Sequence, residues 1–360
     1  MSSLTLSQEK INILKKGVVI PASPLALDKN RKLDKKHQKA LYRYYISAGS
    51  GGIAVGVHTT QFEIREPGIN IFKPLLELAS SEIDGLSQKH KRPILKIAGV
   101  CGKTPQAIEE AKLSASLGYD IALLSLSALK TASDDELIEH CKKISNIIPL
   151  MGFYLQPAVG GRILPYSFWQ RFVEIDNVVA IKIAPFNRYQ TLDVVRAVGL
   201  SSRENEIALY TGNDDNIIMD LLTPYIIKTK EGEKTLRING GLLGQWSVWT
   251  KTFVKLLDEI HNIIESNQSI PSELLIKNVQ LTDANAVLFD AGHNFAGCIS
   301  GINEVLRRQG LLKDNYCLNK KEVLSPGQSE ELDRIYNDYP WLPDDDFVKS
   351  HLAEWLNPKD

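Results

Sequence analysis

The residue whose type and position most clearly allow chemistry is Lys182. It lies in the apolar run 178–185, Val-Val-Ala-Ile-Lys-Ile-Ala-Pro, which is typical of an interior strand of a parallel sheet. Burial disfavours an ammonium, so it lowers the pKa of a lysine and leaves the amine free to attack a carbonyl. This interpretation predicts an imine-forming lysine. The alternative is a lysine that reaches solvent along its four-carbon stem.

Further polar side chains follow other expected strands. Tyr154 ends the strand before that of Lys182, and a phenol near an amine can shuttle the proton of imine formation, whereas a core tyrosine only bonds a neighbour. Thr59 and Thr60 can hold a carboxylate with hydroxyl and N–H groups, or they can satisfy a turn. His58 precedes them and is either a hydrogen-bond donor to substrate or an ordinary loop histidine.

Acidic residues offer two smaller possibilities. Asp214 and Asp215 follow another strand end, where they can bind a hydroxyl-rich substrate or favour the start of a helix through its dipole. We favour the helix interpretation of the pair. Asp290 and His293 are too few for a metal site, so no metal is expected.

The order of elements predicts how these side chains are positioned. Strand-like segments begin near residues 18, 52, 93, 121, 149, 178 and 207, each followed by a helix-like segment, and 239–244 is an eighth strand candidate. This rhythm is that of βα units and predicts an α/β protein with a (β/α)8 TIM barrel. A doubly wound open sheet competes, but no G-x-G-x-x-G follows the first strand. In a barrel the chemistry lies at the carboxyl ends of the strands.

We expect three segments along the chain. Residues 1–16 form a helical lead-in, 17–265 form the barrel, and 266–360 form a C-terminal helical extension. Two alternating stretches around a glycine-bearing turn predict a β-hairpin insertion near 226–238.

Composition limits the possible functions. The chain has 360 residues, 43% hydrophobic and 24% charged, and its formal net charge is -1, which predicts no nucleic-acid partner. No apolar run reaches the ~20 residues of a membrane span, and residues 1–17 do not form a signal peptide. The four cysteines are far apart, so we expect reduced thiols and a cytoplasmic protein.

Taken together, four of these motifs resemble one family. They are Val55-Gly56-Val57-His58-Thr59-Thr60, Phe153-Tyr154-Leu155-Gln156-Pro157, Val178-Val179-Ala180-Ile181-Lys182 and Gly212-Asn213-Asp214. In their order and spacing over residues 17–310, they look like the dihydrodipicolinate synthase and N-acetylneuraminate lyase superfamily.

The resemblance implies a class I aldolase-type mechanism. Lys182 would form a Schiff base with a 2-oxo acid such as pyruvate, and Tyr154 would be the general acid and base. Thr59 and Thr60 would bind the keto-acid carboxylate, with His58, Gly212 and Asp214 as further substrate-binding residues. No cofactor is implied, because the protonated imine is the electron sink, and homodimers or homotetramers are common in the family.

The departures from the family pattern narrow the expectation. The region after the fourth strand, Leu126-Ser127-Ala128-Leu129, lacks the tyrosine of dihydrodipicolinate synthases, and Val159 stands in place of their arginine. We therefore expect a Schiff-base lyase, aldolase or dehydratase rather than dihydrodipicolinate synthesis. A barrel that only binds or senses a keto acid is the alternative, and a third is an enzyme that uses Asp214 and His58 without an imine.

Overall fold

The computed structural model describes residues 5–230 and 232–358. By its internal contacts the chain separates into two compact units, one comprising residues 1–18 and 95–242 and the other residues 19–94 and 243–360. The units cut across the boundaries expected from the sequence at 16/17 and 265/266, which stay a prediction. Glu231, in the turn of the expected hairpin, lies outside the described residues.

The first unit is built on parallel strands in the order β10-β7-β6-β5-β4-β3. These strands are β3 (Leu95–Val100), β4 (Ile121–Leu124), β5 (Leu150–Leu155), β6 (Val178–Ala184), β7 (Ala208–Thr211) and β10 (Gly240–Leu243), the last reaching the unit boundary. Nearly every residue of β3, β5 and β6 is buried, as expected of strands covered on both faces.

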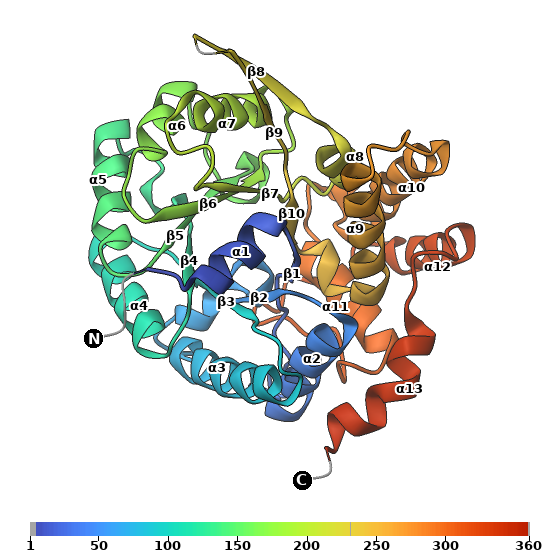
Figure 1. Ribbon diagram of the computed structural model, residues 1–360. Coiled ribbons are helices and arrows are strands. Elements are labelled where there is room, and N and C mark those ends of the chain that lie inside the picture. Colours follow the sequence, from blue (N-terminus) through green and yellow to red (C-terminus); the bar gives the residue numbers. More distant parts are fainter. Residues whose placement is uncertain (1–4, 231, 359–360) are drawn as a thin grey trace. The chain divides into compact units, whose positions relative to one another are not determined.

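Helices follow these strands and lie along one side of them (Figure 1). They are α4 (Thr104–Ser116), α5 (Asp134–Ser145), α6 (Tyr166–Phe172), α7 (Arg188–Leu200) and α8 (Ile217–Leu222), and α1 (Gln8–Lys16) precedes them in the chain. Where the sequence predicts a hairpin, β8 (Tyr225–Thr229) pairs antiparallel with β9 (Gly232–Leu236). The hairpin packs on α7, where Gly199 leaves room for Ile227.

Two sequence signals for helix starts can be checked in this unit. The sequence Ser133-Asp134-Asp135-Glu136 is that of a capping box, and the structure forms one, because Ser133 Oγ accepts the Glu136 N–H and Glu136 Oε2 accepts the Ser133 N–H. Thr104 precedes a proline, as a capping residue often does, but it is the first residue of α4 and Lys103 is the N-cap. The Thr104 hydroxyl lies 2.9 Å from His140 Nδ1.

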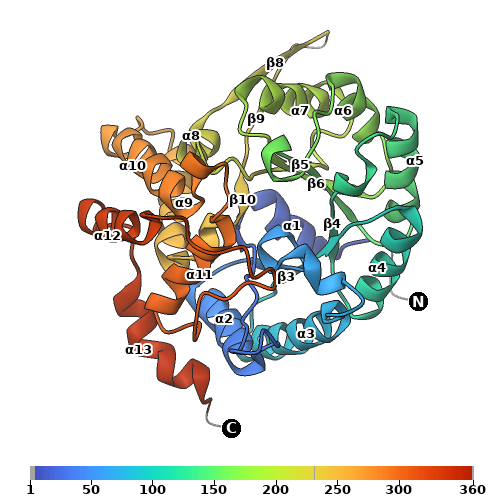
Figure 2. The ribbon, with the colours of Figure 1, turned by 180° about the vertical axis from the view of Figure 1, so that it is seen from behind.

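The second unit holds the first two strands and most of the helices that end the chain. It comprises β1 (Val19–Pro21), α2 (Lys35–Ala48), β2 (Gly52–Val55), α3 (Phe72–Lys89), α9 (Thr250–Glu265), α10 (Ser272–Leu288), α11 (Cys298–Arg308), α12 (Gln328–Asp338) and α13 (Asp345–Leu356). Strands β1 and β2 run parallel, joined by a bridge between Ala22 and Ala54. Figure 2 shows the C-terminal helices α10 to α13 of this unit.

A buried carboxylate joins helices from both ends of the second unit. Asp344 accepts hydrogen bonds from the Tyr44 hydroxyl at 2.7 Å and from Gln309 Nε2 at 2.9 Å. The same hydroxyl accepts the Thr250 N–H at 2.7 Å. Burial raises the pKa of Asp344, and these donors offset part of that effect. The Tyr44 hydroxyl of the early helix α2 therefore depends on Asp344, near the end of the chain, for its buried acceptor.

Candidate active site

Lys182 is the fifth residue of β6, near the carboxyl end of that strand. It is 8% exposed, and its Nζ lies 4.4 Å from the centre of the Phe153 ring on neighbouring β5. Burial lowers the pKa of Lys182 to about 8, and the charge of Asp214 acts in the opposite direction. The free-amine fraction near neutral pH is therefore far higher than for an ordinary lysine, and nucleophilic attack on a carbonyl requires this form.

Gly212, immediately after β7, gives Lys182 its space. A Cβ on Gly212 would lie 2.5 Å from Lys182 Cε and 2.8 Å from Ala184 Cβ, both far inside van der Waals contact. The structure thus brings two of the predicted site residues, Lys182 and Gly212, together. The glycine is needed here for close approach of its backbone to the lysine stem, and its φ angle is not in the left-handed region.

A buried polar network holds the loop that carries Asp214. Fully buried Asp220 accepts hydrogen bonds from Thr211 Oγ1 at 2.7 Å, Asn213 Nδ2 at 2.8 Å and Asn216 Nδ2 at 3.0 Å, and it pairs with Arg188. These bonds tie the end of β7 to α8 on both sides of Asp214. Sequence reasoning missed Asp220. The available signal was a single acid inside the apolar helix Ile-Ile-Met-Asp-Leu-Leu.

Asp215, beside Asp214, belongs to the same loop. Burial raises the pKa of the Asp215 carboxyl, and Arg188, 3.8 Å away, lowers it. Both acids precede α8, which begins at Ile217, so they also stand where the sequence favours acids before a helix.

Tyr154 lies near the carboxyl end of β5, beside the strand of Lys182, as the sequence predicts, but its side chain is on the other face. In the register of β5 and β6, Phe153 pairs with Lys182 and Tyr154 pairs with Ile183, so Tyr154 is on the opposite face of the sheet from the amine. Its hydroxyl donates to the Leu164 carbonyl at 3.1 Å and accepts the Leu164 N–H at 3.2 Å. Its ring packs on Trp169 of α6. The structure therefore does not bring the phenol and the amine together.

In the second unit, the Thr60 hydroxyl binds backbone groups at the end of strand β2. Its hydroxyl accepts the N–H groups of Gly56 at 3.0 Å and Val57 at 3.2 Å, and it donates to the Ser23 carbonyl at 2.7 Å. These three bonds use the hydrogen-bonding capacity of the hydroxyl. The expectation that this hydroxyl grips a carboxylate is corrected, because it holds the backbone instead.

Thr59 differs from its neighbour. Its side chain is 5% exposed, and its hydroxyl forms no hydrogen bond with any of the described residues. Gly244, immediately after β10, lies beside it: a Cβ on that glycine would be 3.4 Å from Thr59 Oγ1. The same Cβ would lie 3.3 Å from the Phe289 ring and 3.4 Å from Ile302. Thr59 thus offers a hydroxyl with unused hydrogen-bonding capacity, near apolar side chains.

His58 is half-buried in the short helix 58–60, with its ring 5.9 Å from the ring of Phe62. The C-terminal extension reaches this loop. Gln61 Oε1 accepts the N–H of Leu318 at 2.6 Å, in the segment between α11 and α12. Within the second unit, part of the extension therefore lies against the loop after β2.

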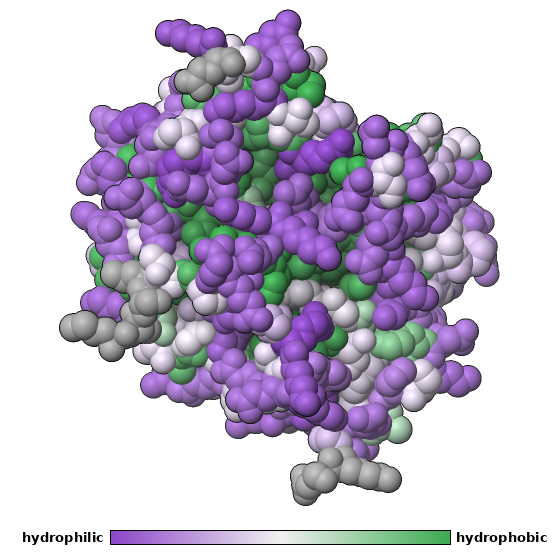
Figure 3. All heavy atoms as spheres, in the orientation of Figure 1, coloured by the Kyte–Doolittle hydropathy of each residue, from purple (hydrophilic) through white to green (hydrophobic). Residues whose placement is uncertain are grey.

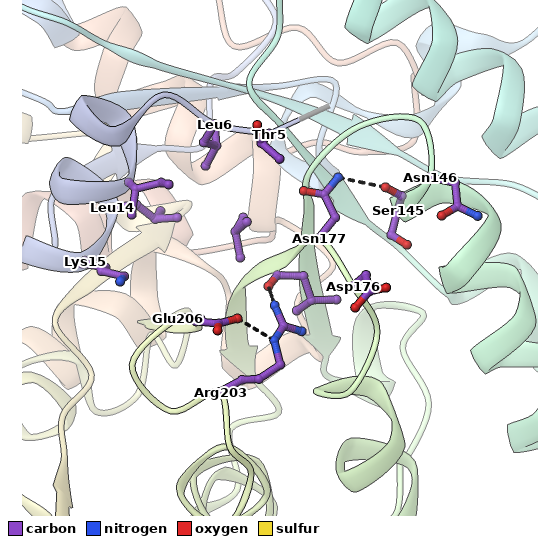
Figure 4. Close-up of a pocket in the computed structure, with 13 residues that line it drawn as sticks. Thr5, Leu6, Leu14, Lys15, Ser145, Asn146, Asp176, Asn177, Arg203 and Glu206 are labelled. Carbon is purple, nitrogen blue, oxygen red and sulfur yellow. Dashed lines mark hydrogen bonds and ion pairs between the residues drawn. The ribbon is translucent and has the colours of Figure 1, made fainter. Parts of the chain in front are cut away.

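A cavity of about 470 Å³ lies at the opposite end of β6, in the first unit (Figure 4). Val178 and Val179 line it from the start of the strand, together with Leu14 of α1. Arg203 donates to the carbonyls of Val173, Ile175 and Val178. Figure 3 shows hydrophobic groups at the surface near α1. Because Lys182 is at the other strand end, this cavity is separate from the predicted chemistry.

Three further observations concern the described residues alone. No group of three or more His, Cys, Asp or Glu side chains among them could hold a metal ion. All four cysteines are buried free thiols. In residues 5–230 and 232–358, every helix is too short or too polar to cross a bilayer.

The chain belongs to the Dihydrodipicolinate synthetase family, whose model matches residues 15–224, more than half of its length. The 4-hydroxy-tetrahydrodipicolinate synthase of Desulforudis audaxviator is 25% identical over 210 residues, covering 57% of this chain and 66% of the relative. That of Oceanobacillus iheyensis is 26% identical over 202 residues, covering 55% and 63%. The matched region thus spans slightly less than two thirds of these relatives.

Solved structures show the fold. Dihydrodipicolinate synthase from Aquifex aeolicus aligns with a TM-score of 0.71 at 17% identity, covering 91% of this chain and 99% of that one. N-acetylneuraminate lyase from Fusobacterium nucleatum gives 0.69 at 16%, covering 90% and 99%. The Escherichia coli K12 protein YagE, in complex with pyruvate, gives 0.70 at 16%, covering 89% and 97%. The predicted (β/α)8 barrel with a C-terminal helical extension is confirmed.

Proposed function

We propose that this protein is a Schiff-base lyase of the aldolase or dehydratase type, acting on a 2-oxo acid such as pyruvate. The observation that carries this proposal is the buried amine of Lys182, whose pKa is lowered to about 8 at the carboxyl end of β6. The amine adds to the keto carbon, and loss of water leaves an iminium. The iminium then accepts the electron pair of the bond that breaks. No cofactor is needed for these steps.

The other site residues divide into three groups in this proposal. In the unit that holds Lys182, Gly212 contributes to substrate binding. The roles that the family resemblance implies for Thr59, which would bind the keto-acid carboxylate, and for His58 stay predictions, because both residues belong to the other unit. Asp214 also contacts substrate. Since its charge acts on Lys182, we assign it the proton transfers that the sequence assigned to Tyr154. Tyr154 holds the 155–164 loop through Leu164.

Two features set the limits of the proposal. The family's tyrosine after the fourth strand and its arginine are missing, so dihydrodipicolinate synthesis itself is not proposed. The position of Tyr154 on the opposite face favours the second candidate, a barrel that binds or senses a keto acid without turnover. We further propose that the protein is cytoplasmic, which its buried free thiols support. We also propose a homodimer or homotetramer, because these assemblies are common in the family.

Borohydride trapping tests the proposal. The protein is incubated with pyruvate and borohydride, and its intact mass is compared with that of Lys182→Ala. We expect a reduced pyruvyl adduct on the wild type alone. An adduct formed only with a longer 2-oxo acid would keep the mechanism and change the substrate. An absence of adduct with every 2-oxo acid would overturn the Schiff-base proposal and leave the binding protein.

A further inference from the structure

Asp220 is a fully buried carboxylate on α8 that joins the loops following β6 and β7. From the loop after β7, Thr211 Oγ1 and Asn213 Nδ2 both donate to its Oδ2. Its Oδ1 accepts Asn216 Nδ2 and pairs with Arg188, the first residue of α7. Both carboxylate oxygens are therefore occupied, by four donors from two loops of the same unit.

A second contact between the same loops runs through Asn213. Its Oδ1 accepts the N–H of Phe186 at 3.0 Å, in the loop after β6, while its Nδ2 donates to Asp220. The φ of Phe186 is 53°, in the left-handed region that a bulky side chain rarely adopts, so its backbone depends on such contacts. Asp220 holds Asn213 in this position, and Asn213 in turn holds the loop that ends the strand of Lys182.

Gly212 and Asp214 are the two groups of the β7 loop that act on Lys182. A Cβ on Gly212 would lie 2.5 Å from Lys182 Cε. Burial lowers the pKa of Lys182, and the charge of Asp214 opposes that effect. Each of the two groups stands between residues whose side chains bind Asp220. The buried carboxylate therefore determines where the glycine backbone and the Asp214 charge lie relative to the amine.

We propose that Asp220 is a positioning residue, which holds Gly212 and Asp214 in place around Lys182 and does not itself contact substrate. The inference rests on the proposed function and deepens it. Stability alone does not explain a buried acid in an apolar helix, because replacing a buried ion pair with apolar side chains of similar volume is often neutral or stabilising. A carboxylate with four donors does fix one arrangement of two loops, which a reacting amine requires.

The other titratable groups near Asp220 set the background for a pH test. Burial raises the pKa of Asp215, Arg188 lowers it, and the charge of Asp220 raises it. Burial and then the charge of Asp220 raise the pKa of Tyr225 to about 12, and Arg188 opposes them. Removing the Asp220 charge would make Asp215 a stronger acid and leave Tyr225 neutral below pH 9. Between pH 6 and 9 the trapping rate therefore reports on the Lys182 amine.

Asp220→Asn tests the inference, because the amide keeps the shape of the side chain but places a donor where donors now bind. Pyruvate trapping is measured from pH 6 to 9, below the melting temperature of the variant. We expect the maximal rate to fall about 10- to 100-fold from misplacement of the groups around the amine. The midpoint should move below its wild-type value near 8, because Asp214 no longer opposes the effect of burial on Lys182.

A double-mutant cycle separates positioning from a direct effect of the Asp220 charge. In an Asp214→Asn background, Asp220→Asn should leave the midpoint where Asp214→Asn alone puts it. An equal shift in both backgrounds would overturn the positioning role. Thr211→Val is a milder second variant, since it removes one bond to Asp220 and keeps the carboxylate. It should slow trapping about 3- to 10-fold.

Asp120→Asn is the matched control. Asp120 is also a mostly buried acid of the first unit, and it binds the backbone N–H of Lys96 and the amine of Lys10 just before β4. This variant should lower the melting temperature, leave the midpoint unchanged and keep the trapping rate within about twofold of wild type.

Two results would overturn the inference in different ways. An unchanged rate and midpoint in folded Asp220→Asn, or in Thr211→Val where Asp220→Asn does not fold, would overturn the positioning role alone. If the wild type forms no adduct with any 2-oxo acid, the proposed function fails and this inference fails with it.

Discussion

Two buried lysines of the first unit have the same sequence context and different surroundings. Lys96 and Lys182 both begin the tripeptide Lys-Ile-Ala on an interior strand, and they are 4% and 8% exposed. Lys96 is the second residue of β3, near its amino end. Lys182 is the fifth of seven in β6, near its carboxyl end. The sequence pattern of a buried lysine is therefore common to both, and only the place along the strand differs.

The neighbours of the two amines follow from that place. The backbone N–H of Lys96 donates to Asp120 at 2.8 Å. The Lys96 Nζ lies near Gly118, just after the end of α4, where backbone carbonyls and the helix dipole favour a cation. Lys182 instead meets the ring of Phe153 and the bare backbone of Gly212. A lysine at the amino end of a barrel strand supports structure, and one at the carboxyl end is placed for chemistry.

The largest effect should come from substituting each of these lysines separately. Lys182→Ala should abolish the borohydride adduct and lower turnover by about 10⁴-fold or more, because no other group replaces the covalent nucleophile. Lys96→Met should keep the adduct and turnover within about threefold, although its stability will change. Trapping and steady-state assays of both variants measure this contrast. Equal losses in the two would remove the distinction between the strand ends.

Gly212→Ala should have the next largest effect. Its Cβ would stand 2.5 Å from Lys182 Cε, so the lysine or the loop must shift. We expect adduct formation to slow by about 10- to 100-fold from misplacement of the amine. Unfolding free energy should also fall by about 1–3 kcal/mol. Gly118 lies beside Lys96 and has a positive φ of 74°. Gly118→Ala should therefore lower stability without slowing adduct formation. Trapping kinetics and denaturant unfolding separate the two.

The pH dependence is a smaller test of the Lys182 environment. The rate of adduct formation should rise with pH as the amine loses its proton, and half of the rise should be reached near pH 8. Since this pKa lies below the value of 10.5 for an ordinary lysine, the unfolded chain binds more protons between the two. Lys182's contribution to the free energy of unfolding therefore rises across that window, by at most about 1.4 kcal/mol per pH unit.

Two measurements follow from this linkage. Trapping rates from pH 6 to 9 should give the midpoint, and urea unfolding at pH 8 and pH 10 should show the rising contribution. The Lys182→Met variant should lack that part of the slope. A trapping midpoint near 10 would mean that burial does not perturb this amine.

The smallest effect is expected for Tyr154→Phe. The change removes two hydrogen bonds to Leu164 and should lower the unfolding free energy by about 1–2 kcal/mol. Trapping with pyruvate should stay within about threefold, because the phenol and the amine are on opposite faces of the sheet. A loss above 100-fold in trapping rate, with stability unchanged, would restore the proton-shuttle role inferred from the sequence.

The sequence predicts the fold well because its signals are local. The eight strand starts, the capping box at Ser133 and the barrel itself follow from periodicity and caps within single elements. The placement of Tyr154 depends on the register between β5 and β6, and a one-residue difference moves a side chain to the other face. No pattern within one strand contains that information.

The two threonines show a second limit of prediction from the sequence. Thr59 and Thr60 are identical in type, yet only one hydroxyl is used by the backbone around β2. The partner of that bond, the carbonyl of Ser23, is far away along the chain. Asp220 was missed for the same reason, since its role depends on the side chains that surround it in space.

The contact between Tyr44 and Asp344 has a consequence for synthesis on the ribosome. The second unit needs residues 243–360, so its first half emerges and then waits while the 148 residues 95–242 are made. At roughly 5–20 residues per second this delay is about 7 to 30 s. During that interval α2 carries a tyrosine hydroxyl and apolar side chains whose final partners do not yet exist. Apolar surface that stays uncovered during synthesis favours aggregation, so we expect this interval to be a vulnerable stage for the nascent chain.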